Sequence, residues 1–430
     1  GGNILFLQLT LGYILGRLLV VALFLPLYFR GELFTAYEVL DRRFGGATKQ
    51  TASLLFLVTR NVGDGLRLFL AAIVLQKVLG LDLVSAIVVI GLTTILYTVV
   101  GGMRSVVWND CIQFVIYMLG ALLALGVIVE HLPGGWGQLI AFGQSHGKFQ
   151  VIDLSVDPTR PYTLWSGLLG GVFIAMATHG TDQLMVQRYL AAGNERRAAW
   201  ALGTSGVVVC GQFAIFLLVG VALACFYQVY PPEVAFARSD AVFARFIVEN
   251  LPVGITGVTL AAVFAAAMST LSSSLNASAT AAINDLYLPR LAEKPSPARL
   301  VWLSRWLTVA FGLAQVGVAI AGRQLEENVI NSVMAIAGFT TGPILGVFFL
   351  GLVPRSVSQR GALFGLVGGL AVLSGVAFGT RLAWPWYAIV GASVTFGMGI
   401  VANALLPVSA GEPSDADDQF EREPRESERP

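Results

Sequence analysis

Charged residues are scarce in this sequence. Asp, Glu, Lys and Arg make up 12% of its 430 residues, whereas a typical soluble domain has about 25%. Hydrophobic residues reach 56%, so an ordinary soluble fold is excluded and most of the chain is expected to lie in lipid. The formal net charge of +1 gives no indication of nucleic-acid binding.

Cysteine and histidine are also rare, and neither has the spacing of a metal site. Cys111, Cys210 and Cys225 lie far apart in apolar segments, which fits small buried side chains and no disulfide framework. The three histidines make no metal-ligand pattern, and the motifs H-E-x-x-H and G-x-S-x-G are missing. We therefore expect no enzymatic activity.

The chain instead contains many long apolar segments. A helix needs roughly 20 mainly apolar residues to cross the hydrocarbon layer, and eleven segments meet this need. The sequence thus predicts an all-α integral membrane protein with about eleven transmembrane helices. The segments are 4–29, 51–76, 83–102, 106–129, 163–187, 200–228, 254–284, 301–322, 328–353, 359–380 and 385–407.

The few charged residues indicate an orientation and a tail. Loops on one side of the eleven segments carry thirteen basic residues and the alternate loops carry seven. The richer side is expected in the cytoplasm, which places the start of this chain outside and its end inside. Residues 409–430 are polar, highly charged and contain proline, which predicts a disordered cytoplasmic tail after a transmembrane bundle at 1–408.

The segment 265–287, AAAMSTLSSSLNASATAAINDLY, is unusually rich in hydroxyl groups for an apolar chain. Small polar residues let helices pack closely and share hydrogen bonds. Alternatively, the hydroxyls of Ser269 and Thr270, with backbone carbonyls near Ala266, supply oxygen ligands to a small hard cation. The pattern alone leaves both interpretations open. At helical spacing, one face holds Ala266, Ser269, Ser273, Asn276 and Thr280, with Thr270 beside it.

Charged side chains also occur inside the predicted membrane segments, where they are costly unless paired. Arg60, Asp64 and Arg67 share one helix face, so Asp64 can pair with both arginines. This arrangement fits either a structural ladder or the lining of a cavity. Asp110 lies one turn inside the segment 106–129, where the helix dipole favours a carboxylate. A place on a cation exit path is the alternative role for Asp110.

The segment 163–187 contains several glycines, which weaken a helix and permit a break. His179, Asp182 and Gln183 follow close to its cytoplasmic end. Many transporters use a broken helix with polar groups at the break to expose backbone groups to substrate. His179 is therefore either a hydrogen-bonded packing residue or a substrate ligand.

With these motifs the sequence resembles the sodium/solute symporter family, which includes sodium/glucose cotransporters and bacterial proline and pantothenate symporters. The resemblance implies a leucine-transporter-type bundle with a five-plus-five inverted repeat, which imports solute with the sodium gradient by alternating access. The most specific match is 265–287. It is supported in family order by GYILGR (12–17), FRGELFTAYEVLDRRFG (29–45), GGMRSVVWNDCIQF (101–114), GTDQLMVQRYLAA (180–192) and FTTGPILGVFFLG (339–351).

The resemblance also implies residue roles. Ala266, Ser269 and Thr270 match positions of a sodium site, and Asp110 matches an acidic residue on the inward exit route, with Asn109 replacing the usual threonine. Family members typically have two further N-terminal helices, one of which is broken and supplies carbonyls to the same site. This chain lacks an initiator Met, so we expect it to begin after them, and eleven plus two segments give the family's common thirteen.

Sugar-transporting relatives place bulky aromatics before the TDQ-like motif, where this chain has Thr178 and His179. Among sugars, amino acids and organic acids, this favours a smaller polar solute or an organic acid. Thr178, His179 and Gln183 are the candidates to bind it. We expect sodium as the coupling ion, a plasma membrane location (the inner membrane in a bacterium), and no obligate protein partner. The alternative is a non-transporting sensor built on the same bundle.

Overall fold

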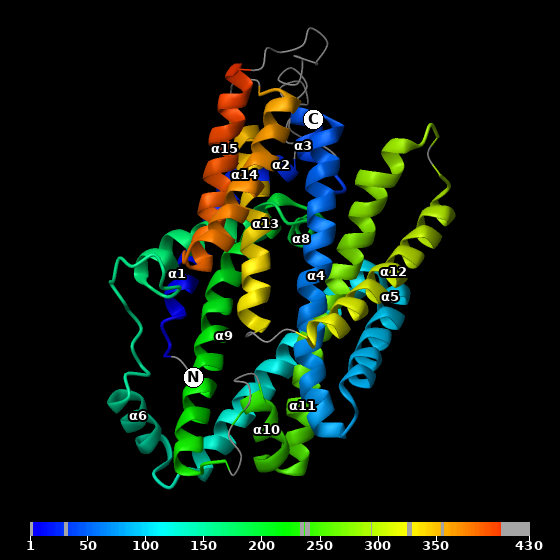
Figure 1. Ribbon diagram of the computed structural model, residues 1–430. Helices are drawn as coiled ribbons and strands as arrows, with labels where there is room; N and C mark the ends of the chain where they lie inside the picture. Colours follow the sequence, from blue (N-terminus) through cyan, green and yellow to red (C-terminus); the bar gives the residue numbers. More distant parts are fainter. Residues whose placement is uncertain are drawn as a thin grey trace.

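Helices dominate the computed structural model, and the described residues contain no strand. The longer helices run mostly along one axis and form a bundle (Figure 1). The tail expected at 409–430 lies outside the described residues. Described are residues 3–29, 33–232, 236, 241–293, 295–324, 329–353 and 357–405, without the side chains of 77–78, 102–105, 241 and 329–339.

Over the described residues, the predicted membrane segments fall on helical elements, some on one helix or part of one and others, such as 4–29 and 163–187, on two or three consecutive elements. In the described part of the chain, seven helices are long and apolar enough to cross a membrane. The elements are α1 (Leu7–Leu23), α2 (Leu25–Tyr28), α3 (Glu38–Phe44), α4 (Gly46–Leu79), α5 (Leu83–His131), α6 (Gly135–Ser145), η1 (Ser166–Gly170), α7 (Gly171–Gly180), α8 (Gln183–Ala191), α9 (Glu195–Val229), α10 (Ala241–Asn250), α11 (Val253–Ala281), η2 (Ala282–Tyr287), η3 (Leu288–Arg290), α12 (Pro297–Gly322), α13 (Val329–Leu352), α14 (Gln359–Gly379), η4 (Trp384–Trp386) and α15 (Tyr387–Leu405).

Capping residues explain where several helices begin. Asp82 accepts hydrogen bonds from the backbone amides of Val84 and Ser85 at the start of α5, and Asn194 caps α9 in the same way. Such side chains satisfy amides that have no partner within the helix. Gly80, with φ +64°, ends α4 in the left-handed conformation that glycine adopts without strain.

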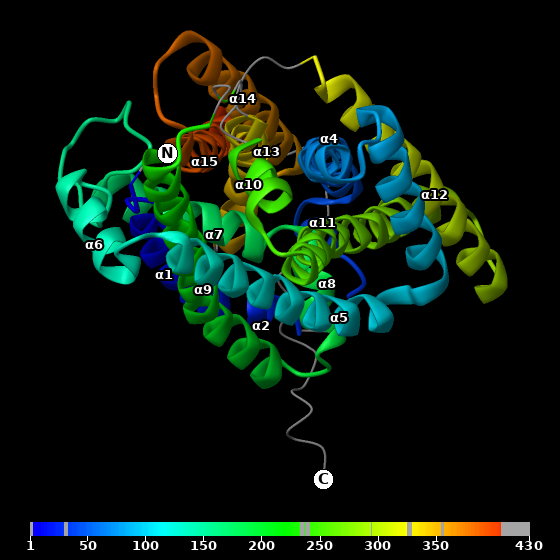
Figure 2. The same ribbon diagram turned by 90° about the horizontal axis from the view of Figure 1, so that it is seen from below.

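The predicted segments 83–102 and 106–129 belong to a single element. The helix α5 has 49 residues. A straight helix of that length would measure roughly 70 Å at 1.5 Å per residue, more than twice the hydrocarbon thickness of about 30 Å. Figure 2 shows the ribbon turning sharply between its blue first half and its cyan second half. Each half, Leu83–Gly101 and Val106–His131, keeps the length and composition of a membrane span.

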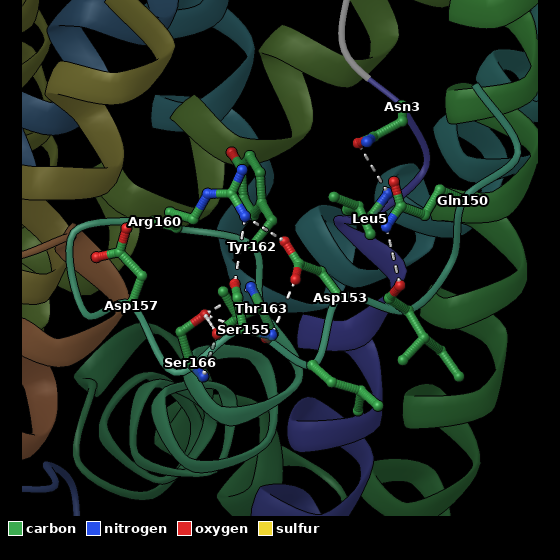
Figure 3. A network of polar contacts seen from close by, with 12 residues as sticks. Asn3, Leu5, Gln150, Asp153, Ser155, Asp157, Arg160, Tyr162, Thr163 and Ser166 are labelled. Atoms are coloured by element: carbon green, nitrogen blue, oxygen red, sulfur yellow. Dashed lines mark hydrogen bonds and ion pairs between the residues drawn. The ribbon is translucent and has the colours of Figure 1, made fainter. Parts of the chain in front are cut away.

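The long loop after α5 carries the short helix α6. Its second part is fastened to the start of α1, because the Asp153 amide donates to Gln8 Oε1 over 3.0 Å and Gln8 Nε2 donates to the Tyr162 carbonyl. Figure 3 shows Asp153, Ser155 and Arg160 gathered in this loop, with Arg160 Nη1 3.0 Å from Asp153 Oδ2. Hydrogen bonds from Ser155 hold the pKa of Asp153 below its ordinary value.

Helix α1 packs closely on η1 and α7, and glycines make this approach possible. A Cβ at Gly12 would lie 2.3 Å from the Gly167 carbonyl oxygen, and one at Gly16 would lie 2.6 Å from the Ala175 Cβ. Neither position can accept a larger side chain without separating the helices. This contact brings the second half of α1 against the end of α7, where the polar residues of the site begin.

Candidate functional site

The helix expected to be broken is interrupted between α7 and α8. Helix α7 ends at Gly180, and Asp182 adopts an extended conformation before α8. The Asp182 carboxylate accepts the Leu184 amide over 2.8 Å, so it caps the new helix. The break thus falls at the sequence GTD and not at the upstream glycines, where η1 forms a π-helical turn.

A cavity of about 80 Å³ lies beside this break. It is large enough for a few water molecules and small next to common ligand pockets of roughly 300–1,000 Å³. Tyr37, Phe56 and Ile344 contribute apolar surface. The polar residues of its lining are Thr59, Arg60, Arg67, Thr178, Thr181, Asp182, Thr340 and Thr341.

The charge ladder predicted on α4 forms and also borders the cavity. Arg60 Nε lies 2.7 Å from Asp64 Oδ2, Arg67 pairs with Asp64 Oδ1, and the Asp64 side chain is completely buried. Arg60 also reaches across to the break, where its Nη1 lies 3.6 Å from Asp182 Oδ2. The ladder is therefore both a structural ion-pair cluster and part of the cavity lining, because Asp64 holds two arginines that line the cavity.

The three solute-binding candidates occupy different positions. Thr178 lies in the cavity lining, and the His179 ring lies next to it, with Nδ1 2.9 Å from Thr178 Oγ1. Gln183 is completely buried, and its amide group holds the segment before α3 through the Ala36 amide and the Phe34 carbonyl. In the described structure, one of the three candidates therefore contributes to the cavity surface.

The proposed ion residues lie on the middle of α11. Thr270 Oγ1 donates to the Ala266 carbonyl over 3.5 Å, which keeps both groups on one side of the helix. The Ser269 hydroxyl turns toward α5 and donates to Asp110 Oδ1 over 2.5 Å. The structure thus brings the hydroxyl face of α11 into direct contact with the carboxylate expected on the exit path.

Arg188 is a functional candidate that the sequence did not single out beyond its contribution to loop charge. Its Nη2 lies 2.6 Å from Asp110 Oδ2 and 2.6 Å from Ser273 Oγ. One guanidinium on α8 therefore joins α5 to α11. The signal available in the sequence was Asp110 itself, because a carboxylate among apolar residues requires a cationic partner from elsewhere in the bundle.

A second hydrogen-bond network joins α4, which lines the cavity, to α11, which carries the proposed ion residues. Gln315 of α12 donates to Asn61 Oδ1 over 3.0 Å and to Ser274 Oγ over 3.3 Å. Asn61 of α4 donates to Ser278 Oγ over 3.2 Å. All four side chains are buried, so the network ties α4, α11 and α12 together where no water competes for its hydrogen bonds.

Comparison with known proteins agrees with this architecture. The sodium:solute symporter family profile matches residues 3–369. The human sodium/iodide cotransporter is 33% identical over 88% of this chain and 59% of its own length. The multivitamin transporter of Oryctolagus cuniculus, which is sodium-dependent, is 32% identical over 86% and 58%. Human sodium-coupled monocarboxylate transporter 2 is 29% identical over 88% and 63%, so the chain spans about three fifths of these relatives.

A solved structure supports the fold directly. A Na⁺-coupled sialic acid symporter, in a substrate-bound outward-open state, superimposes with a TM-score of 0.82 and 25% sequence identity. The similarity covers 94% of this chain and 87% of that one. The all-α bundle of the leucine-transporter type predicted from the sequence is thereby confirmed.

Proposed function

The chain belongs to the sodium:solute symporter family, and we propose that it imports a small polar solute together with sodium by alternating access. Its membrane-spanning helices make it a multi-pass membrane protein. We place it in the plasma membrane, or the inner membrane of a bacterium, with the start of this chain outside and its end in the cytoplasm. The distribution of basic residues supports that orientation.

The contact between Ser269 and Asp110 is the observation that carries the proposal. These residues are 159 positions apart and lie on different helices. In our account, the Ala266 carbonyl and the hydroxyls of Ser269 and Thr270 bind sodium. Uncharged oxygens hold a monovalent ion weakly enough to release it. Asp110 then offers the departing cation a negative group beside the site.

The cavity between α4, α7, α8 and α13 is our candidate for the solute site. Arg60 and Arg67 both pair with Asp64, and Arg60 also lies 3.6 Å from Asp182, whose other carboxylate oxygen caps α8. Among the described residues Arg67 pairs with Asp64 alone, and we propose that its guanidinium binds a small anion together with threonine hydroxyls such as that of Thr178. Relatives named for iodide and for monocarboxylates support the same class, of which we favour an organic acid.

Coupling requires that sodium stabilise the conformation that binds solute well, since a ligand shifts an equilibrium only through its different affinities for the two states. The network of Asn61, Ser274, Ser278 and Gln315 is a physical connection between the two sites. The alternative of a membrane sensor receives no support from the relatives described above, which are all named as cotransporters, transporters or symporters.

Uptake by proteoliposomes tests the proposal. We expect labelled lactate, iodide or sialic acid to accumulate under an inward sodium gradient and not under a potassium gradient of equal strength. The double variant Ser269→Ala/Thr270→Ala should lose this accumulation. Ser374→Ala is the matched control, because among the described residues the one partner of its hydroxyl is the Leu370 carbonyl of its own helix. Uptake that ignores sodium, or that survives in the double variant, would contradict the proposal.

A further inference from the structure

Arg17 is a buried cation with an unusual set of neighbours. It lies on α1 with 5% of its surface exposed. Its Nε and Nη1 have no hydrogen-bond partner in the described structure, and its Nη2 lies 3.1 Å from His179 Nε2. Buried guanidinium groups normally pair with a carboxylate, so a contact with a histidine ring requires an explanation.

The chemistry of arginine fixes the state of that ring. A guanidinium has only hydrogen-bond donors, so His179 Nε2 must accept a hydrogen bond from Arg17. A ring that accepts at Nε2 is neutral and carries its own proton on Nδ1. That proton is directed at Thr178 Oγ1, 2.9 Å away, and at the Ala175 carbonyl one turn earlier.

Thr178 follows Arg17 and His179 in this series of hydrogen bonds and lies in the lining of the cavity. Its hydroxyl donates to the Ile174 carbonyl over 2.8 Å, so its one proton is used and one of its two lone pairs is taken by His179. The remaining lone pair is available to the cavity that Thr178 lines. Thr178 therefore presents an acceptor to the solute and no donor.

The charged and titratable groups near the His179 ring are few in the described structure. Arg188 of α8 is the second positive charge that acts on the ring, and Tyr13 of α1 and Tyr189 of α8 lie near Arg17. The other elements packed against α7 are η1, α13 and α15. Their sequences contain no charged residue, and Tyr387 at the start of α15 is their one ionisable side chain. The charged groups that the described structure places near the ring are thus two arginines, of which Arg17 is in contact with it and Arg188 is paired with Asp110.

We propose that Arg17 is a positioning residue that locks His179 in its neutral Nδ1–H form, and thereby makes Thr178 a hydrogen-bond acceptor for the solute. This inference rests on the proposed role of the cavity as the solute site. The lock has a second consequence, because a His179 that stays neutral neither takes up nor releases a proton during transport. Close packing of Gly16 on Ala175 holds α1 near enough to α7 for the contact.

Histidine NMR tests the lock without any transport assay. The protein contains three histidines, so ¹⁵N-histidine labelling gives few signals, and His179→Gln identifies the relevant one. We expect His179 in sodium to keep the neutral Nδ1–H signature from about pH 8 to about pH 5.5, below the ordinary histidine pKa of about 6.5. In Arg17→Met this pure signature should be lost, and Arg17→Lys, which retains a donor, should restore it.

Arg160→Gln is the matched control, because Arg160 is an exposed loop residue whose loss should leave the His179 signal unchanged. An Nε2–H signature in the wild type, or titration of its His179 above about pH 5.5, would overturn the proposal, as would an unchanged signature in Arg17→Met. The wild-type measurement decides the matter even if Arg17→Met does not fold.

The pH dependence of lactate uptake gives a functional readout. The KM ratio between about pH 5.5 and pH 7.5 should be near one in the wild type and change by about threefold or more in Arg17→Met. Adding His179→Gln to Arg17→Met should remove that dependence, and a dependence that persists would contradict the role of His179. If no solute is taken up at all, the proposed function fails, whereas the NMR result still decides the role of Arg17.

Discussion

Asp64 and Asp110 are both carboxylates inside the helical bundle, and both pair with arginine, but the arginines come from different places. Asp64 pairs with residues of its own helix, four positions before it and three after it. Asp110 on α5 pairs with Arg188 of α8 and accepts hydrogen bonds from Ser269 and Ser273 of α11. Both pairs of Asp64 are local to α4, although Arg60 also reaches Asp182 at the break, whereas the contacts of Asp110 join three elements.

This difference separates a fixed part of the site from a part that can move. An ion pair within one helix travels with that helix and survives any rigid-body motion. A pair between helices has to break when they separate, which is how many conformational switches work. We therefore interpret the Asp64 ladder as the permanent frame of the cavity and the Asp110–Arg188 pair as a closure of the ion exit.

Removing the charge of Asp64 should have the largest effect on stability. Asp64→Asn leaves two arginines beside a buried neutral group, and breaking a buried pair costs about 3 kcal/mol. We expect a large loss of thermal stability with the sodium concentration for half-maximal uptake unchanged in the surviving protein. A thermal melt and a sodium titration measure the two quantities. A normal melting temperature would show that the ladder does not frame the cavity.

The matching change at Asp110 should affect function more than folding. The side chains of Arg188 and Asp110 are 26% and 19% exposed, whereas that of Asp64 is completely buried, so we expect Asp110→Asn to cost less stability than Asp64→Asn. We expect sodium-driven uptake to fall by about tenfold, because the departing ion loses its negative neighbour. The control Asp157→Asn removes a loop carboxylate outside the bundle. Unaltered uptake in Asp110→Asn would contradict the exit role.

A smaller effect is expected from Arg188→Gln, which sharpens the comparison. Without the guanidinium the exit is closed less firmly, and the apparent affinity for sodium should change by about threefold. The double variant with Asp110→Asn should show no further change beyond Asp110→Asn alone, since both act through one contact. Additive effects in this double-mutant cycle would mean that the two residues act independently.

The sequence predicted the local features and missed the distant ones. The pairing of Asp64 with both arginines follows from helical spacing alone, and the break before α8 follows from a glycine and a capping aspartate. The contact of Arg188 with Asp110 spans 78 positions, and that of Arg17 with His179 spans 162. Both depend on how the helices pack, which no local pattern encodes. The two spans predicted at 83–102 and 106–129 are both present, and the apolar pattern did not predict that helical hydrogen bonding continues between them.

The choice of solute residues shows the same limit. Thr178, His179 and Gln183 are close in sequence, but they do not share one site. Thr178 and His179 lie on α7, and the turn between α7 and α8 separates Gln183 from them. Gln183 faces the segment before α3, and His179 faces α1. Arg60 and Arg67, which the sequence suggested only as a possible lining, meet Thr178 at the cavity because α4 packs beside the break.

Sodium binding by the hydroxyl face of α11 is the central claim, and thermal stability in sodium against potassium at equal ionic strength tests it most directly. A ligand at about 100 times its dissociation constant stabilises the protein by roughly 2.7 kcal/mol. We predict that sodium raises the melting temperature of the wild type and of Ser374→Ala but not that of Ser269→Ala/Thr270→Ala. Equal melting temperatures in the two salts for the wild type, or an undiminished sodium effect in the double variant, would contradict the account.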